Sequence, residues 1–287
     1  MKYAWIEEHR DQYPVTRMCR VLAVSRSGYC QWRGREPSAR AQANEVLDRQ
    51  VARLHVDSGR SYGRARIVAG LRAQGVLVGG ERVRRSLKRQ QLKPVYRRHY
   101  VVTTDSAHKL PVAANLLERR FTGWQPDQAW VGDITYVPTA QGWVFLAAVM
   151  DLACRVIVGW AMSERIDATL VCNALRMAYW RRRPSPGLLM HSDRGSQYAS
   201  KDHRDLVTEL GMTMSMSRRA NAWDNAVIES FFKTLKVERV YQVRYETRDQ
   251  ARLDLVNWIE GFYNRQRIHG AAGMQAPIDR ERELSVA

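Results

Sequence analysis

The sequence predicts an α/β fold, in which a mixed five-stranded sheet is flanked by helices and preceded by an all-α region. The main observation is a series of β-forming segments that starts at Ala129 and alternates with segments of helical period. The second is a set of cationic helical segments before residue 96. The length of 287 residues suggests about two domains, and 45% hydrophobic residues suffice for a core in each.

The all-α region is predicted to contain a helix-turn-helix. A helix over residues 38–55 has an apolar side formed by Val46, Leu47, Val51 and Leu54. The segment SYGRARIVAGLRAQG predicts a second helix that ends near Gly75, and ERVRRSLKRQQL predicts a third helix before Pro94. This spacing of helices and turns is typical of DNA-binding modules.

The third of these helices is predicted to have a buried side and a basic side. Val83 and Leu87 mark the buried side. The opposite side and its flank carry a cluster of cations, formed by Arg82, Arg85, Lys88 and Arg89. This basic side either contacts DNA, chiefly its phosphates, or is simply a solvated face.

The second half of the chain has the element order of an RNase H-like core. An antiparallel three-stranded meander is predicted for AWVGDITYV, WVFLAAVMD and RVIVGWAM, with a turn at residues 140–142. It is followed by helix TLVCNALRMAYWRRR, strand GLLMHSD, helix KDHRDLVTELG, strand MTMSMS and a helix from Asn225. A last amphipathic helix has its apolar side at Leu253, Val256, Trp258, Ile259 and Phe262.

Three carboxylates occupy positions that this layout brings together. Asp133 lies inside AWVGDITYV, Asp193 ends GLLMHSD before a glycine-containing loop, and Glu229 lies on the helix from Asn225. A buried carboxylate is costly unless something pairs it, and hard divalent cations prefer oxygen ligands. We therefore expect a site for two Mg²⁺ or Mn²⁺ ions, about 3.5 to 4 Å apart, that catalyses phosphoryl transfer. Taken singly, each acid could be an ordinary surface residue.

The helix that carries Glu229 is predicted to be two-sided. At 100° per residue its core face collects the apolar residues Val227, Ile228, Phe231, Phe232 and Leu235. A separate sector of roughly 80° collects polar residues, namely Asn225, Glu229, Lys233 and Lys236. Asp224 is a candidate N-cap. Glu229 and Lys233 could also form an ordinary exposed pair on the helix.

Two further residues near these acids have open roles. His191 could orient a group close to Asp193, or it could be a hydrogen-bonded structural histidine. Trp223 could stack on or wedge a displaced base, or it could pack in the core.

The charge distribution indicates a polyanionic partner. The formal net charge is +17, as expected of a protein that meets nucleic acid. Residues 1–125 contain 25 Lys/Arg and 10 Asp/Glu, whereas residues 126–287 contain 21 and 19. The first half is therefore expected chiefly to hold DNA and the second half chiefly to catalyse.

We expect five segments along the chain. They are an N-terminal helical segment at 1–37, a helix-turn-helix DNA-binding domain at 38–95, a basic linker at 96–125 that could itself follow DNA, a catalytic core at 126–240, and a C-terminal helix with a basic tail at 241–287. No apolar run approaches the roughly 20 residues of a membrane span. The four cysteines form no C-x-x-C pair, which favours a cytoplasmic protein.

Several motifs resemble a known family. WVGDITYVPT, HSDRGSQYAS and DNAVIESFFKTLKVE look like the three catalytic motifs of the second-reading-frame (OrfB) transposases of bacterial insertion sequences, which have a retroviral integrase-like DDE core. The resemblance extends to SYGRARI in the helix-turn-helix and to YNRQRIHGAAG near the C-terminus. It departs from the family pattern at Ala65, where Arg is common, and at Ala272, where Leu is usual.

The resemblance implies roles for particular residues. Asp133, Asp193 and Glu229 would be the metal ligands, and Lys236 would contact the DNA end, with Lys233 and Asn225 beside it. Arg64 and Arg66 of SYGRARI would contact DNA, although Ala65 puts the usual contact of that motif in doubt.

The resemblance also implies partners and a location. Double-stranded DNA, as element end and as target, would be bound by a homo-oligomer in the bacterial cytoplasm, associated with the nucleoid. An upstream OrfA segment, commonly joined by ribosomal frameshifting, would complete the active form.

The expected function is therefore that of an insertion-sequence transposase. It would catalyse metal-dependent phosphodiester cleavage and strand transfer through a DDE triad. The alternative is a non-catalytic DNA-binding regulator, or an inactive unfused OrfB product.

Overall fold

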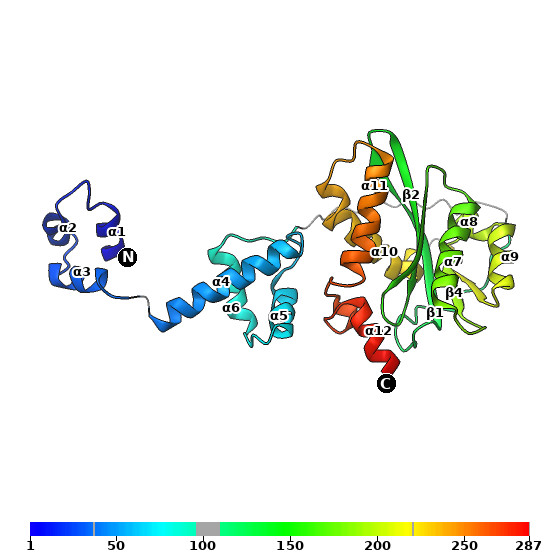
Figure 1. Ribbon diagram of the computed structural model, residues 1–287, viewed down its shortest axis with the longest axis horizontal. Coiled ribbons are helices and arrows are strands. Elements are labelled where there is room, and N and C mark those ends of the chain that lie inside the picture. The colour runs from blue at the N-terminus through cyan, green and yellow to red at the C-terminus, as the bar shows by residue number, and fades with distance from the viewer. Residues whose placement is uncertain (37, 96–109, 220, 287) are drawn as a thin grey trace. The chain divides into compact units, whose positions relative to one another are not determined.

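The computed structural model describes residues 1–36, 38–95, 110–219 and 221–286 (Figure 1). The chain divides into two compact units, Met1–Gln50 and Val51–Ala287. The five segment boundaries expected from the sequence stay a prediction. None of the helices in the described ranges combines the length and the hydropathy that crossing a membrane requires.

The first unit begins with three short helices around a small core. These are α1 (Lys2–Glu8), α2 (Val15–Val21) and α3 (Arg26–Arg33). Their buried side chains form one cluster of Ile6, Met18, Cys19 and Tyr29. The N-terminal region is therefore a packed unit and not only a helical leader.

The predicted helix-turn-helix region contains three helices, α4 (Ala39–Asp57), α5 (Arg64–Ala73) and α6 (Gly80–Arg89). Val83 and Leu87 on α6 are buried, as expected. The expected end of α6 was wrong, because the helix stops at Arg89 and Gln91 adopts a left-handed φ of 55°. Val46 was also expected on the apolar side of α4, yet it is 48% exposed. It lies one position away from the buried Leu47, which places it about 100° around the helix.

A mixed five-stranded sheet forms the centre of the second unit, which confirms the predicted α/β core. The strands are β1 (Ala129–Thr139), β2 (Gly142–Asp151), β3 (Ile157–Ser163), β4 (Leu189–Ser192) and β5 (Thr213–Met216). Their order across the sheet is β3-β2-β1-β4-β5. The first three strands run antiparallel, and β4 and β5 run parallel to β1. The turn predicted at residues 140–142 joins Thr139 to Gly142, whose φ of 106° suits glycine.

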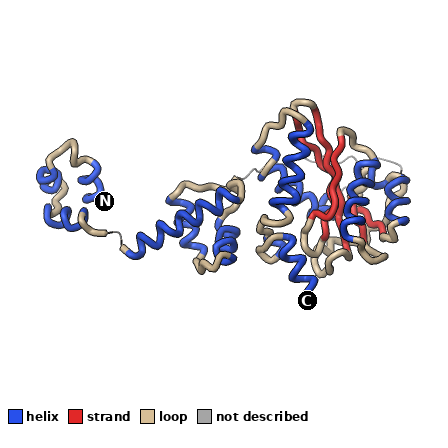
Figure 2. Tube along the Cα trace, viewed as in Figure 1, coloured by secondary structure: helices blue, strands red, loops and turns tan. Residues whose placement is uncertain are grey.

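Helices cover both faces of this sheet (Figure 2). One face packs against α10 (Ala226–Glu238) and α11 (Arg248–Val256), through a core that includes Ile228, Phe231 and Leu255. The other face packs against α7 (Ala168–Arg182), α8 (Ser196–Ala199) and α9 (Lys201–Glu209). The chain ends in α12 (Pro277–Val286). Two helical layers thus enclose a sheet whose central strand is β1.

The last amphipathic helix differs from the prediction. After Val256, helix α11 continues into a π-helical turn, Asn257–Tyr263. Leu253 was expected on the apolar side but is 66% exposed. At 100° per residue it lies nearly opposite the midpoint between Ala251 and Leu255, which are fully buried. Leu253 is therefore an apolar residue on the solvent side of the helix.

Part of the predicted linker packs against the sheet of the second unit. Leu117 is fully buried, and the backbone N–H groups of Leu116 and Leu117 donate to the hydroxyl of Ser215, at 3.0 and 3.3 Å. Residues 110–125 thus include a segment, at 114–117, that contacts the edge strand β5. The rest of the linker, residues 96–109, lies outside the described residues, so its contact with DNA stays a prediction.

Candidate active site

Strand register brings Asp133 and Asp193 close together, where the pairing of β1 with β4 ends. The parallel strands β1 and β4 pair Gly132 with Ser192. Asp133 directly follows Gly132, and Asp193 directly follows Ser192, so the two acids lie level with each other. Neighbouring strands are about 4.8 Å apart, which is close enough for two carboxylates to interact strongly.

The environment of Asp133 disfavours its negative charge. Burial raises the pKa of Asp133 well above its usual value, and the negative charges of Asp193 and Glu229 raise it further. A hydrogen bond from the backbone N–H of Ile134, at 2.7 Å, and the positive charge of Lys236 oppose this rise. The pKa of Asp133 is therefore affected by both of the other predicted acids.

A tight loop holds Asp193. Its Oδ1 accepts a hydrogen bond from the backbone N–H of Gly195 at 2.9 Å. A Cβ atom on residue 195 would lie 3.0 Å from that same oxygen, so a larger residue here would require a small shift of the carboxylate.

Helix α10 carries Glu229 to the same region. The predicted core face is confirmed, since Ile228, Phe231, Phe232 and Leu235 are buried and Val227 packs against them. Burial raises the pKa of Glu229, and the negative charge of Asp193 raises it further. Asp133, Asp193 and Glu229 thus lie near enough to one another, on a strand, a loop and a helix, for their charges to interact.

Asn225 anchors the start of this helix. Its side-chain Nδ2 donates to the carbonyl oxygen of Gly132 at 3.3 Å, and the residue is only 3% exposed. Asn225 was expected to contact DNA. That contact stays a prediction, because the structure places the amide on the backbone beside Asp133.

The two lysines of α10 differ in their surroundings. Lys236 is partly buried, with its Nζ 4.4 Å from the centre of the Tyr136 ring. Burial lowers the pKa of Lys236, and the negative charge of Asp133 opposes that change. Lys236 is thus the cation beside the acids, whereas Lys233 is exposed to solvent.

The donor set suits a hard divalent cation but does not enclose one. Among the residues that the structure describes, no three His, Cys, Asp or Glu side chains are gathered closely enough to hold a metal by themselves. The carboxylates are nevertheless close enough to raise one another's pKa. Mg²⁺ commonly binds in this way, through one or two carboxylates with water and substrate phosphates as the other ligands.

Asp224 was expected to cap α10, and that prediction was wrong. The N-cap of α10 is Asn225, and no side-chain hydrogen bond caps the helix. Asp224 is instead fully buried and accepts hydrogen bonds from the guanidinium groups of Arg218 and Arg119 and from the amide of Asn115. Two arginines compete with the helix N-terminus for this carboxylate, and they form charge-assisted hydrogen bonds with it.

Sequence reasoning did not find this Asp224 network or the nearby Tyr198. Burial raises the pKa of Tyr198, and the charges of Asp133 and Asp193 raise it further, which places the phenol beside both acids. The available signal was the position of Tyr198 in the motif HSDRGSQYAS. No local pattern pairs Asp224 with Arg119, which lies 105 residues earlier.

His191 and Trp223, for which the sequence leaves two roles each, differ in their surroundings. His191 is fully buried in β4, where its Nδ1 lies 2.8 Å from the hydroxyl of Ser215 and its Nε2 lies 3.3 Å from that of Ser217. Burial lowers the pKa of His191 to about 4. The structure therefore favours the structural role. Trp223 is 72% exposed, so core packing is wrong and stacking on a base stays a prediction.

The predicted DNA-binding cations of the helix-turn-helix fall into two groups. The exposed residues are Arg64, Arg82, Arg85, Lys88 and Arg89, although Arg85 also pairs with Glu81 at 3.0 Å. Arg66 differs, because its guanidinium lies 3.5 Å from Glu238 and stacks over the Tyr62 ring. Glu238 also forms two 2.7 Å hydrogen bonds with the buried Arg267. Arg66 therefore joins α5 to the C-terminal part of the chain.

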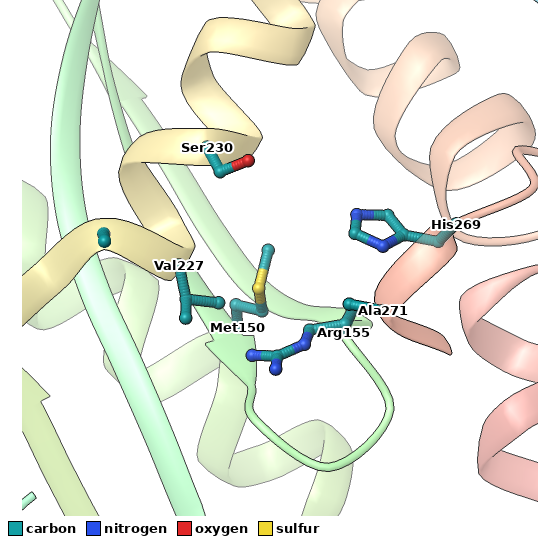
Figure 3. Close-up of a pocket in the computed structure, with 7 residues that line it drawn as sticks. Met150, Arg155, Val227, Ser230, His269 and Ala271 are labelled. Carbon is teal, nitrogen blue, oxygen red and sulfur yellow. The ribbon is translucent and has the colours of Figure 1, made fainter. Parts of the chain in front are cut away.

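A cavity of about 200 Å³ lies on another side of α10. Figure 3 shows Ser230 and His269 pointing toward each other across it, with Arg155 and Met150 along one side. Burial lowers the pKa of His269 to about 4, and the charges of Arg267, Arg155 and Arg66 lower it further. None of the three carboxylates lines this cavity, so the acidic site is a separate feature.

Comparisons with known proteins find matching family models and similar sequences. A family model described as "Integrase core domain" matches residues 124–222, a second with the same description matches 210–277, and an "HTH-like domain" model matches 41–100. The insertion element IS600 uncharacterized 31 kDa protein of Shigella sonnei is 43% identical over 91% of this chain and 96% of its own length. Transposase InsF for insertion sequence IS3A of Escherichia coli (strain K12) is 41% identical over 96% of this chain and 97% of its own.

Among solved structures, the catalytic core domain of BIV integrase is 20% identical and has a TM-score of 0.42. That match covers 56% of this chain and 97% of the integrase domain.

Proposed function

Because this chain belongs to the insertion-sequence transposases that carry an integrase core domain, we propose that Asp133, Asp193 and Glu229 are its catalytic carboxylates. They would hold divalent metal ions, Mg²⁺ or Mn²⁺. The carboxylate oxygens match the preference of these ions, and their burial creates a negative site that a cation would stabilise.

One observation carries this proposal. The pairing of Gly132 with Ser192 aligns Asp133 and Asp193 on adjacent parallel strands, and the pKa of Asp133 responds to both Asp193 and Glu229. A scaffold without catalytic function would gain nothing from three mutually repelling acids, because each costs free energy to bury. This cost argues against the alternative of a non-catalytic regulator.

The proposed chemistry consists of two phosphoryl transfers. Water first attacks a phosphodiester at an element end, which forms one P–O bond, breaks another and frees a 3′-hydroxyl. That hydroxyl then attacks a second phosphodiester and displaces its 3′-oxygen, so the number of P–O bonds is conserved. When bound, two metal ions would activate the attacking oxygen and stabilise the leaving oxygen.

The remaining side chains would position the DNA. Lys236 lies beside Asp133 and would hold a backbone phosphate near the scissile bond, and the exposed Lys233 would contact the same strand further out. The exposed cations of α6, with Arg64, would contact duplex DNA away from the site. Oligomerisation on DNA, an upstream OrfA segment and a cytoplasmic location remain part of the proposal.

A metal-dependence assay tests the proposal. A labelled duplex that carries the terminal sequence of the element is incubated with the full chain and Mg²⁺, Mn²⁺ or Ca²⁺, and cleaved and joined products are resolved on a gel. We expect products with Mg²⁺ and Mn²⁺ from the wild-type protein and none from Asp193→Asn, with DNA binding retained. Equal products from both proteins would refute the assignment of the carboxylates.

If neither protein forms products although both bind DNA, the assay is repeated with the upstream segment fused to the chain. Products from the fused wild type alone would support the carboxylate assignment and show that the segment is required. Their absence from the fused wild type would favour the regulator.

A further inference from the structure

The three N-terminal helices have the geometry of a second helix-turn-helix. Four residues separate the end of α2 at Val21 from the start of α3 at Arg26. Ala23 adopts a left-handed φ of 50° in this turn, a position where glycine is common. The backbone N–H of Val24 donates to the carbonyl of Cys19 at 3.0 Å, which closes the end of α2.

The second helix of this pair is fixed at its start and on its inner side. The hydroxyl of Ser25 accepts a hydrogen bond from the backbone N–H of Gly28 at 2.9 Å and caps α3. Tyr29 faces inward and is 2% exposed, within the core of Ile6, Met18 and Cys19. Helix α3 is therefore capped at its start and packed on its inner side, and its opposite side faces solvent.

The outer face of α3 offers side chains that can read bases. At 100° per residue, Ser27 and Gln31 each lie about 160° from the buried Tyr29, and both are exposed. Arg26 is exposed in the first turn of the same helix. Glutamine pairs with adenine, arginine with guanine and serine with several bases in the major groove.

Helices α2 and α3 themselves carry charge of one sign, and Glu7 of α1 pairs with Arg33 of α3 at 3.6 Å. From Gln12 to Arg33 the chain contains four arginines and no Asp or Glu. Arg17 and Arg20 lie exposed on α2, which is the helix that crosses the DNA backbone in such modules. Within the described part of the chain, no side-chain hydrogen bond or ion pair engages Arg17, Arg20 or Arg26, unlike Arg10, which pairs with Glu7 at 2.8 Å.

We propose that residues 1–36 bind double-stranded DNA as a second helix-turn-helix, distinct from the one at 41–100. Helix α3 lies in the major groove and reads bases through Arg26, Ser27 and Gln31. Helix α2 places Arg17 and Arg20 on backbone phosphates. This segment lies outside the residues matched by the three family models, and the inference is independent of the carboxylate chemistry.

The alternative is that this surface binds a protein instead of DNA, because Trp5 and Trp32 are 43% and 40% exposed. Trp32 does not belong to the outer face of α3, since its ring packs 5.9 Å from that of Tyr3 on α1. The exposed arginines of α2 and α3 match a polyanion better than an apolar partner.

Salt-dependent binding of the full chain tests the phosphate contacts. The probe is a pool of random-sequence duplexes, and the test variant is Arg17→Gln with Arg20→Gln. The matched control is Arg10→Gln with Arg35→Gln, which removes the same charge from the same unit. Each phosphate contact contributes about 0.9 to the slope of log affinity against log salt, so the slope should fall by about 2 in the test variant only. Equal slopes in test and control variants would overturn the proposal.

Selection from the same pool tests the base contacts. The wild type should enrich a sequence feature that Gln31→Ala no longer enriches, while circular dichroism shows that the variant keeps its helices. An unchanged enriched sequence would contradict the placement of α3. Altered sedimentation of these variants without any change in DNA binding would identify the surface as a protein interface and would also overturn the proposal.

Discussion

The side-chain Nδ2 of Asn225 donates to the carbonyl oxygen of Gly132 at 3.3 Å. This bond joins the residue before helix α10 to the residue before Asp133. It therefore fixes the distance between the element that carries Glu229 and the strand that carries Asp133. The side-chain Oδ1 of Asn225 is buried and accepts no hydrogen bond from the described residues.

Asn225→Ala should slow joining more than it weakens DNA binding. The change removes the link between α10 and β1, and a misplacement of about 1 Å in a catalytic group can cost about 100-fold in rate. Single-turnover joining and duplex affinity are measured on the same preparation. Asn257→Ala, at an exposed position in the C-terminal helical region, is the matched control. A loss confined to DNA affinity would show that Asn225 contacts DNA instead.

Asp224→Asn should destabilise the protein, and the effect should depend on pH. Hydrogen bonds from Arg218 lower the pKa of Asp224 well below its usual value, despite its burial. The carboxylate therefore contributes stability above its unfolded pKa of about 3.9, and this contribution is lost as pH falls through the lower folded pKa.

The free energy of unfolding from urea titration checks this prediction. We expect Asp224→Asn to be about 1 to 3 kcal/mol less stable than wild type at pH 7. The difference should shrink below about pH 4, where the carboxylate of the unfolded wild-type chain takes up a proton while that of the folded protein is still ionised. A difference that does not change with pH would show that the ion pairs contribute little.

Gly159→Ala should destabilise the sheet. A Cβ atom at this position would lie 2.3 Å from the carbonyl oxygen of Ala174 and 2.6 Å from the backbone nitrogen of Ala178, so β3 and α7 would have to separate. Overpacking of this kind costs about 1 to 3 kcal/mol. Urea unfolding compares it with Gly261→Ala, where a Cβ atom meets nothing within 4 Å. Equal stability of the two variants would contradict the close packing of α7 on β3.

Trp223→Ala should leave stability within about 0.5 kcal/mol, because the side chain is 72% exposed. If Trp223 stacks on a displaced base, the variant should lose about 1 to 3 kcal/mol of affinity for a duplex with an unpaired end, and Trp223→Phe should regain most of it. Fluorescence anisotropy measures the affinity for duplexes with paired and with unpaired ends, and a loss confined to unpaired ends indicates stacking. Unchanged affinity for both ends would exclude the stacking role.

Local patterns predicted the strands and most helices of the second unit, and they singled out three acids that the structure places near one another. The β-formers around Asp133, the loop after Asp193 and the two-sided helix of Glu229 each contain their signal within about ten residues. What local patterns could not provide is register. The pairing of Gly132 with Ser192 joins residues 60 positions apart and depends on how the whole sheet assembles.

The wrong or missing predictions arise in the same way, because a local pattern does not report what the rest of the fold places around a residue. Asp224 has the composition of an N-cap, but Arg119 and Arg218 from elsewhere in the fold bind it more strongly than a helix terminus would. Leu253 is apolar yet faces solvent, which composition alone does not exclude. The N-terminal helix-turn-helix geometry escaped prediction because its turn has Ala23, and not glycine, in the left-handed conformation.

Strand transfer by Glu229→Gln tests the central claim most directly, because the substitution keeps the shape of the side chain and removes its charge. The measurement is the rate at which a labelled element-end duplex joins to target DNA in Mg²⁺, with duplex affinity measured in parallel. The account predicts that joining disappears while affinity stays within about twofold, a change of about 0.4 kcal/mol. Joining at the wild-type rate would contradict it.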